Sequence, residues 1–155
     1  MGNNAQAFQE YETPRALFDE WDQRFHFTLD AAASPMNALC PRFFTKDDDG
    51  LVQDWGKEVV WCNPPYARWQ LFRWVAKAHD ASCKGATVVL LIPTSIETEW
   101  FHTYVWDKVK RSERPGVEFH PLQGRPRFSD PRNKAKSYKG WRPLTACMVV
   151  VFHAV

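Results

Sequence analysis

Two uninterrupted apolar segments constrain the fold of this chain more than any other feature. Residues 86–92 read Ala-Thr-Val-Val-Leu-Leu-Ile, and residues 146–152 read Ala-Cys-Met-Val-Val-Val-Phe. A strand that is apolar on both faces must be covered on both sides, which is typical of a sheet lying between layers of helices. Pro93 follows the first segment directly and predicts the end of that strand.

Helical and extended patterns alternate along the rest of the chain. Helices are predicted from residue 13, over 68–82 and over 94–109, and shorter strands over 25–29 and 117–120. This alternation predicts an α/β fold with a doubly wound, mostly parallel sheet, helices on both faces and an antiparallel C-terminal hairpin.

Two of the predicted helices have recognisable starting signals. Thr13 is expected to be the N-cap of the first helix, with Pro14 at the first helical position, where a missing N–H is no loss. Thr94 and Glu97 have the spacing of a capping box and predict the start of the helix over 94–109.

A third apolar stretch, residues 58–62, runs straight into Asn63-Pro64-Pro65-Tyr66. Two consecutive prolines fix two φ angles and hold Asn63 extended, so this corner is stiff. The Asn63 amide oxygen and the Pro64 carbonyl can accept hydrogen bonds from an exocyclic amine, and Tyr66 can stack on a flat base. The alternative is a purely structural turn that closes the strand.

Basic side chains are concentrated in residues 124–143. This segment carries seven of them against Asp130 alone, a charge of +6, whereas the whole chain carries +2 and the remainder therefore −4. Such a segment suits contact with a phosphate backbone, although a solvated surface loop is the alternative. The predicted DNA contacts are Arg125, Arg127, Arg132, Lys134, Lys136 and Lys139, and Arg142 completes the seven.

Composition predicts a soluble cytoplasmic protein of one domain. The 155 residues suffice for one core, with a loose polar tail over 1–10 and a single domain over 11–155. The four cysteines show no Cys-x-x-Cys spacing, so we expect reduced, buried thiols rather than disulfides or a zinc site. No signal peptide or apolar run of membrane length is apparent, and no metal is expected.

The motifs, taken in order, resemble the small phage-type DNA N6-adenine methyltransferases that use S-adenosylmethionine. The resemblance covers nearly the whole chain, and the four-residue corner matches the catalytic motif of these amino-methyltransferases. It rests on Tyr11-Glu12-Thr13-Pro14, Phe27-Thr28-Leu29-Asp30-Ala31-Ala32-Ala33, Asp48-Asp49-Gly50-Leu51, Asp54-Trp55 and Asn63-Pro64-Pro65-Tyr66.

The resemblance implies a Rossmann-like methyltransferase fold and methylation of the N6 amine of adenine at specific DNA sites. It also implies a host-cell cytoplasmic location if the chain is phage-encoded, and a mark that protects DNA from restriction. A chain this small could cover duplex DNA as a homodimer. Catalysis is assigned to Asn63, Pro64, Pro65 and Tyr66, and binding of S-adenosylmethionine to Tyr11, Thr13, Pro14, Asp30, Ala31, Ala32, Asp54 and Asn63.

Acidic side chains at two places in the chain are predicted to bind the cofactor or the target base. In the family, the turn after Asp30 holds the methionine part of the cofactor, where a carboxylate can pair with the α-amino group; for Asp30 alone, a helix N-cap is the alternative. The larger superfamily has glycines in this turn, where this chain has alanines. A second acidic side chain should contact the cofactor or the target base, and Asp54 is favoured over Asp49. The alternative is that the acidic residues over 47–54 form only a solvated turn. Phe43, Phe44 or Trp55 could stack on the cofactor's purine.

The expected mechanism needs no covalent intermediate. Asn63 and the Pro64 carbonyl would hold both N–H bonds of a flipped-out adenine and aim its lone pair at the sulfonium methyl. Two other functions stay open: methylation of another amine or amide, such as RNA adenine or protein glutamine, and nucleic-acid binding without catalysis.

Overall fold

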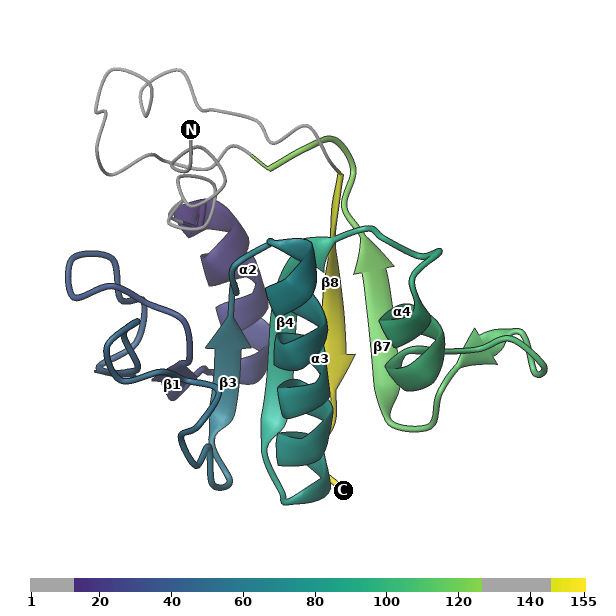
Figure 1. The fold of residues 1–155 in the computed structure, drawn as a ribbon. Coiled ribbons are helices and arrows are strands. Elements are labelled where there is room, and N and C mark those ends of the chain that lie inside the picture. Colours follow the sequence, from purple (N-terminus) through teal and green to yellow (C-terminus); the bar gives the residue numbers. More distant parts are fainter. Residues whose placement is uncertain (1–12, 127–145) are drawn as a thin grey trace.

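The computed structural model describes residues 13–126 and 146–155, and shows an α/β fold built on a six-stranded sheet (Figure 1). The predicted tail and Tyr11 lie outside this range. The order of the large sheet is β2-β1-β3-β4-β8-β7. Its strands are β1 (Leu29–Asp30), β2 (Arg42–Phe43), β3 (Val59–Cys62), β4 (Thr87–Pro93), β7 (Val117–Pro121) and β8 (Cys147–Phe152). A two-stranded sheet joins β5 (Trp106–Asp107) to β6 (Ser112–Glu113), and the helices are α2 (Arg15–Phe25), α3 (Arg68–Cys83) and α4 (Glu99–Tyr104).

The large sheet is mixed. β1 pairs in parallel with β2 and β3, and β3 pairs in parallel with β4. β8 runs antiparallel to both of its neighbours, with Val150 opposite Leu90 on one side and Phe119 on the other. The predicted α/β class and the antiparallel C-terminal pair are therefore confirmed, and the sheet combines both pairing types.

Helices cover both faces of this sheet. Along β4, Val88, Leu90 and Ile92 pack with α3 and α4, whereas Val89 and Leu91 pack with α2. Every one of these five β4 side chains is fully buried. Burying one such side chain contributes roughly 1.5–3 kcal/mol, which explains why the apolar segments form the centre of the fold.

The start of the chain differs from two predictions. Residues 25–29 do not form one strand: Phe25 is the last residue of α2, and β1 begins only at Leu29. Trp21 and Phe25 stack one helical turn apart, and His26 ends the helix with a φ of 55°. Short apolar runs are ambiguous between strand and helix, and here packing along α2 decides.

The predicted N-terminal caps of the first helix and of the helix over 94–109 are also wrong. α2 begins at Arg15 with Pro14 at the N-cap position, and no side chain caps it. α4 begins at Glu99, five residues after Thr94, because Ser95 and Thr98 form a turn in which the Thr98 hydroxyl donates to the Ser95 carbonyl at 2.7 Å. The helix ends at Tyr104 rather than near residue 109, since β5 follows at Trp106.

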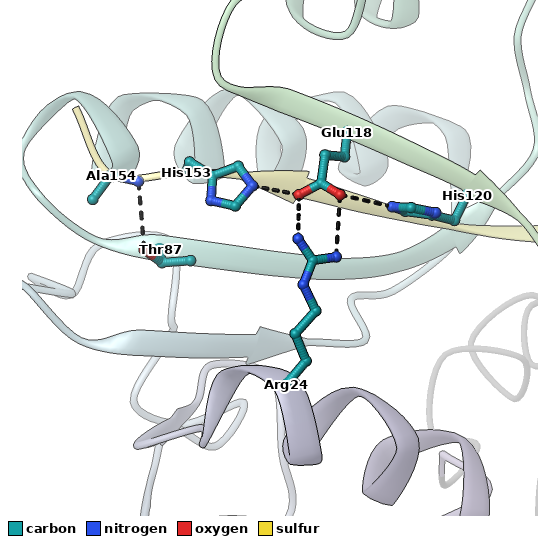
Figure 2. A network of polar contacts seen from close by, with 6 residues as sticks. All are labelled: Arg24, Thr87, Glu118, His120, His153 and Ala154. Carbon is teal, nitrogen blue, oxygen red and sulfur yellow. Dashed lines mark hydrogen bonds and ion pairs between the residues drawn. The ribbon is translucent and has the colours of Figure 1, made fainter.

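A polar network ties α2 to the C-terminal strands (Figure 2). The Glu118 carboxylate accepts two hydrogen bonds from the Arg24 guanidinium, at 2.7 and 3.1 Å. Nε2 of His120 lies 3.1 Å from one carboxylate oxygen, and Nε2 of His153 contacts the other. The Arg24 hydrogen bonds, with smaller contributions from both histidines, lower the pKa of Glu118 from 4.5 to about 2.

Three of the four cysteines are buried free thiols, as predicted, but Cys83 at the end of α3 is exposed. Within residues 13–126 and 146–155, no helix is both long and apolar enough to cross a membrane.

Candidate active site

The proline corner lies where β3 ends. Val60, Trp61 and Cys62 are fully buried between β1 and β4, so the sheet fixes the residue that comes next. Asn63 is half-buried and Pro64 is buried. α3 begins at Arg68, so only five residues separate β3 from the helix. In parallel sheets ligands collect at this carboxyl edge.

Asn63 is held by one side-chain hydrogen bond. Its Nδ2 donates to the Thr13 hydroxyl at 3.1 Å, across fifty positions of sequence. That bond commits the amide nitrogen and leaves Oδ1 as an acceptor. Within the described part of the chain, neither Oδ1 of Asn63 nor the Pro64 carbonyl accepts a hydrogen bond. Their role as acceptors for an exocyclic amine stays a prediction.

Tyr66 is anchored to the sheet. Its hydroxyl donates to the Leu91 carbonyl of β4 at 3.1 Å. Its half-buried ring packs against the apolar side chains between α2 and the sheet, which include Phe18 and Trp61. Burial raises the pKa of the Tyr66 phenol well above its ordinary value, with Cys147 adding to the effect. The phenol is therefore neutral, and its hydroxyl braces the corner against β4. Stacking of a base on this ring stays a prediction.

Asp30 is the last residue of β1 and is paired with Trp61 of the neighbouring β3, two residues before Asn63. Its side chain is only 4% exposed and accepts hydrogen bonds from the backbone N–H groups of Leu39 (3.1 Å) and Ala32 (3.4 Å). Burial raises the pKa of Asp30 from 3.8 to about 6, despite the opposing effect of both N–H groups. The carboxylate thus shapes the small-residue turn after β1, and does not cap a helix.

The acidic turn over 47–50 lies against the same end of β1. A Cβ placed on Gly50 would come within 2.3 Å of the Ala31 carbonyl oxygen, so only glycine allows this approach. Asp49 next to it has a φ of 55° and accepts a hydrogen bond from the Leu51 N–H at 3.1 Å. Asp48 accepts from the backbone N–H and hydroxyl of Thr45.

Asp54 lies elsewhere. It is exposed, precedes β3 and accepts a hydrogen bond from the Gly56 N–H at 2.8 Å. It lines a shallow pocket of about 290 Å³ together with Lys77 and Asp80 from the C-terminal half of α3. Because α3 runs back along the sheet from Asn63, this pocket is at the opposite end of β3. The structure therefore places Asp30 and Asp49 near the carboxyl end of β1, and places Asp54 near the opposite end of β3.

The basic segment is attached at the carboxyl edge. Leu122 after β7 donates its N–H to the Cys147 carbonyl, and the Thr94 N–H after β4 donates to the Ala146 carbonyl. Cys147 is opposite Pro93, so the segment leaves and rejoins the fold at the edge where Asn63 lies. Of the predicted DNA contacts, Arg125 is described and exposed. Arg127, Arg132, Lys134, Lys136 and Lys139 lie outside the described residues.

Two supporting contacts were not found from the sequence. Thr13 is predicted to bind the cofactor, whereas in the structure its hydroxyl accepts a hydrogen bond from the Asn63 amide. The Leu91 carbonyl that holds Tyr66 is a backbone group, and backbone groups leave no signal in a sequence pattern. Among the described residues, no three His, Cys, Asp or Glu side chains are grouped so that they could hold a metal ion.

Comparison with known proteins identifies the family of the chain. The chain is 36% identical over 93 residues to a DNA N-6-adenine-methyltransferase of Escherichia phage T1. That alignment covers 59% of this chain and 38% of the phage protein, so the chain spans well under half of that relative's length. The model of the family described as DNA N-6-adenine-methyltransferase (Dam) matches residues 4–134, which include every element from α2 to β7. The resemblance found in the motifs is thereby confirmed: the chain belongs to the DNA N-6-adenine-methyltransferase (Dam) family.

Proposed function

We propose that this chain transfers a methyl group from S-adenosylmethionine to the exocyclic N6 amine of adenine at specific sites in DNA. The observation that carries the proposal is the Asn63 corner: the Asn63 amide nitrogen donates to Thr13, and within the described residues neither its amide oxygen nor the carbonyl of the next residue, Pro64, accepts a hydrogen bond. Family membership supports the same reaction.

The adenine amine is a poor nucleophile because its lone pair is delocalised into the ring. Asn63 Oδ1 and the Pro64 carbonyl each accept one N–H of the amine, which favours a tetrahedral nitrogen with a directed lone pair. The same two oxygens stabilise the positive charge that develops on nitrogen during transfer. The rigid corner holds this geometry before the substrate arrives, so little reorganisation is needed.

The residues around Asp30 suit S-adenosylmethionine, which supplies an electrophilic methyl group on a sulfonium. A buried carboxylate suits the cationic amino acid part, and Asp49, exposed next to the glycine that packs on Ala31, suits the ribose hydroxyls. We take the sheet to be a doubly wound, Rossmann-like methyltransferase sheet, with its ligands at the carboxyl edge.

Within this proposal Asp49, rather than Asp54, is the second acid at the cofactor. Asp49 adjoins the one glycine that packs on the turn after β1, whereas Asp54 lies beyond the far end of β3. An acid about twenty residues after the first strand commonly binds ribose hydroxyls in related sheets.

A stacked adenine cannot reach the corner, so the target base is flipped out of the duplex. The basic segment supports DNA as the carrier of that base, because both of its ends join the fold at the carboxyl edge. Contact with phosphates there would hold the strand while the base enters.

The test is methyl transfer by Asn63→Ala. Using radioactive methyl donor, we expect wild-type protein to label DNA in preference to RNA or protein, and the variant to lose more than nine-tenths of the labelling. Because Asn63 makes one side-chain hydrogen bond, the variant should keep the wild-type unfolding temperature within a few degrees. Labelling of RNA or protein in preference to DNA, or substantial activity in the folded variant, would contradict the proposal.

A further inference from the structure

Two aromatic side chains are exposed on the first turns of α3. Trp69 is 63% exposed and Phe72 is 50% exposed, although tryptophan and phenylalanine are usually largely buried. They are three positions apart and therefore neighbours on one side of the helix. The side of α3 that faces the sheet is formed instead by Leu71, Trp74 and Val75, all buried. Packing within the described fold thus does not explain the exposed pair.

This pair begins next to the Asn63 corner. Trp69 lies three residues after Tyr66, in the first turn of α3, and Phe72 follows one turn later. Among the described residues neither ring stacks on another aromatic ring, whereas Trp74 on the buried side stacks on Trp55. The exposed pair therefore lies on the helix that directly follows the corner where the adenine is proposed to bind.

The charge around the pair is positive. Residues 68–79 contain three basic residues and no acidic one, and Arg73, which is exposed, directly follows Phe72. The first turn of α3 contains no acidic residue and no side-chain cap, so nothing there opposes a polyanion. Two copies of this chain meeting through this face would bring like charges together, whereas a nucleic acid strand would neutralise them.

We propose that Trp69 and Phe72 form a stacking platform for bases of the DNA strand that leads to Asn63, with Arg73 on the adjacent phosphates. Exposed aromatic rings beside a basic residue bind single-stranded bases in many proteins, independently of sequence. Unstacking one adenine exposes the faces of its neighbours, and the platform gives those faces a replacement partner. The inference rests on the proposed function for the identity of the strand.

Stacking and phosphate contact respond differently to salt, which allows a sharp test. Binding of a fluorescein-labelled DNA strand is measured by anisotropy at several salt concentrations, beside a strand with abasic residues in place of bases. Trp69→Ala should weaken binding of the base-bearing strand roughly five-fold to a hundred-fold, without changing the salt dependence. Phe72→Ala should act in the same direction. Both should bind the abasic strand as the wild type does.

Two matched variants control for general effects. Arg73→Gln should reduce the slope of log affinity against log salt by about one, on both strands. Val109→Ala, at an exposed position between β5 and β6, should change nothing. Wild-type affinity in a folded Trp69→Ala or Phe72→Ala protein, or equal losses on both strands, would overturn the platform. Conversion of a dimer into a monomer by Trp69→Ala, seen by sedimentation, would assign the face to a second copy instead.

Measuring the binding of DNA strands separates this inference from the proposed function, since strand binding needs neither cofactor nor methyl transfer. Methylation of DNA with unchanged binding by the variants would reject the platform alone. Base-dependent binding by a chain that methylates nothing would reject the methyltransferase and keep the platform.

Discussion

At Asn63, a single hydrogen bond decides how a side-chain amide is used. An unrestrained amide can present its nitrogen or its oxygen, and only the oxygen can accept from an amine. The Thr13 hydroxyl accepts the nitrogen end, so in the proposed function the oxygen end is left to accept from the substrate amine. Thr13 precedes α2, so a residue fifty positions before Asn63 in the sequence holds the amide of the corner.

Replacing Thr13 by valine should lower kcat and leave the folded structure intact. Valine keeps the shape of the side chain but cannot accept the amide, so the amide loses its orientation. A net hydrogen bond contributes about 1 kcal/mol, so we expect kcat to fall roughly five-fold. Steady-state kinetics should show little change in KM for DNA. Thr13→Ser, which restores the hydroxyl, should recover most of the rate, and equal losses in both variants would contradict an orienting role.

The two acidic candidates can be separated by cofactor binding. Asp49→Asn should weaken binding of S-adenosylmethionine about ten-fold or more, because a charged acceptor for ribose hydroxyls is lost. Asp54→Asn should bind the cofactor as the wild type does, since Asp54 lies at the far end of β3. Titration calorimetry measures both. The reverse order of effects would restore Asp54 as the cofactor residue.

Among the elements, α2 has two connections to the sheet. Its apolar face packs Phe18 against Trp61 and Phe27, and Arg24 near its C-terminus binds Glu118 of β7. The second connection joins the helix to the edge strand, three strands away from β3 in the sheet. The two connections together join α2 to the sheet from β3 to β7.

Acid should weaken this second connection in a defined range. The pKa of Glu118 is lowered to about 2 in the folded protein from an ordinary value of 4.5, chiefly by Arg24. The stabilisation is therefore complete above about pH 4.5 and is lost as the pH falls through about 2. Glu118→Gln should lower the free energy of unfolding at neutral pH by on the order of 2 kcal/mol, since the group is partly solvated.

Denaturant unfolding between neutral and acid pH measures this effect. The difference between wild type and Glu118→Gln should shrink as the pH approaches 2. Glu113→Gln, at an exposed position of β6, is the matched control and should leave the profile unchanged. A pH-independent difference would show that Glu118 acts through packing rather than charge.

The sequence predicted the elements whose own residues determine them. Residues 68–82 and 86–92 became α3 and β4, because their apolar periodicity matches burial on one face or on both. The capping box at Thr94 failed because local turn hydrogen bonds compete with helix capping, and Ser95 with Thr98 formed such a turn. The stiffness of the Asn63 corner could be predicted because prolines restrict the backbone locally. Its partners were not, since Thr13 and Leu91 reach it only through tertiary folding.

In the fold as a whole, the residues to which the proposed function assigns roles follow the carboxyl ends of parallel strands of the large sheet. Asp30 is the last residue of β1, Asn63 directly follows β3, and β4 provides the carbonyl that accepts a hydrogen bond from Tyr66. The helices and the antiparallel pair of β7 and β8 cover or extend the sheet and supply its apolar core. One rigid layer thus positions residues that are far apart in the chain.

The way β8 is inserted has a consequence for the connection before it. It is clamped on both sides, by six residue pairs with β4 and five with β7, so Leu122 and Ala146 are fixed neighbours whatever joins them. The entropy of closing such a connection rises only slowly with its length. A change in the length of that connection should therefore leave the Asn63 corner and the pairing of β8 in place.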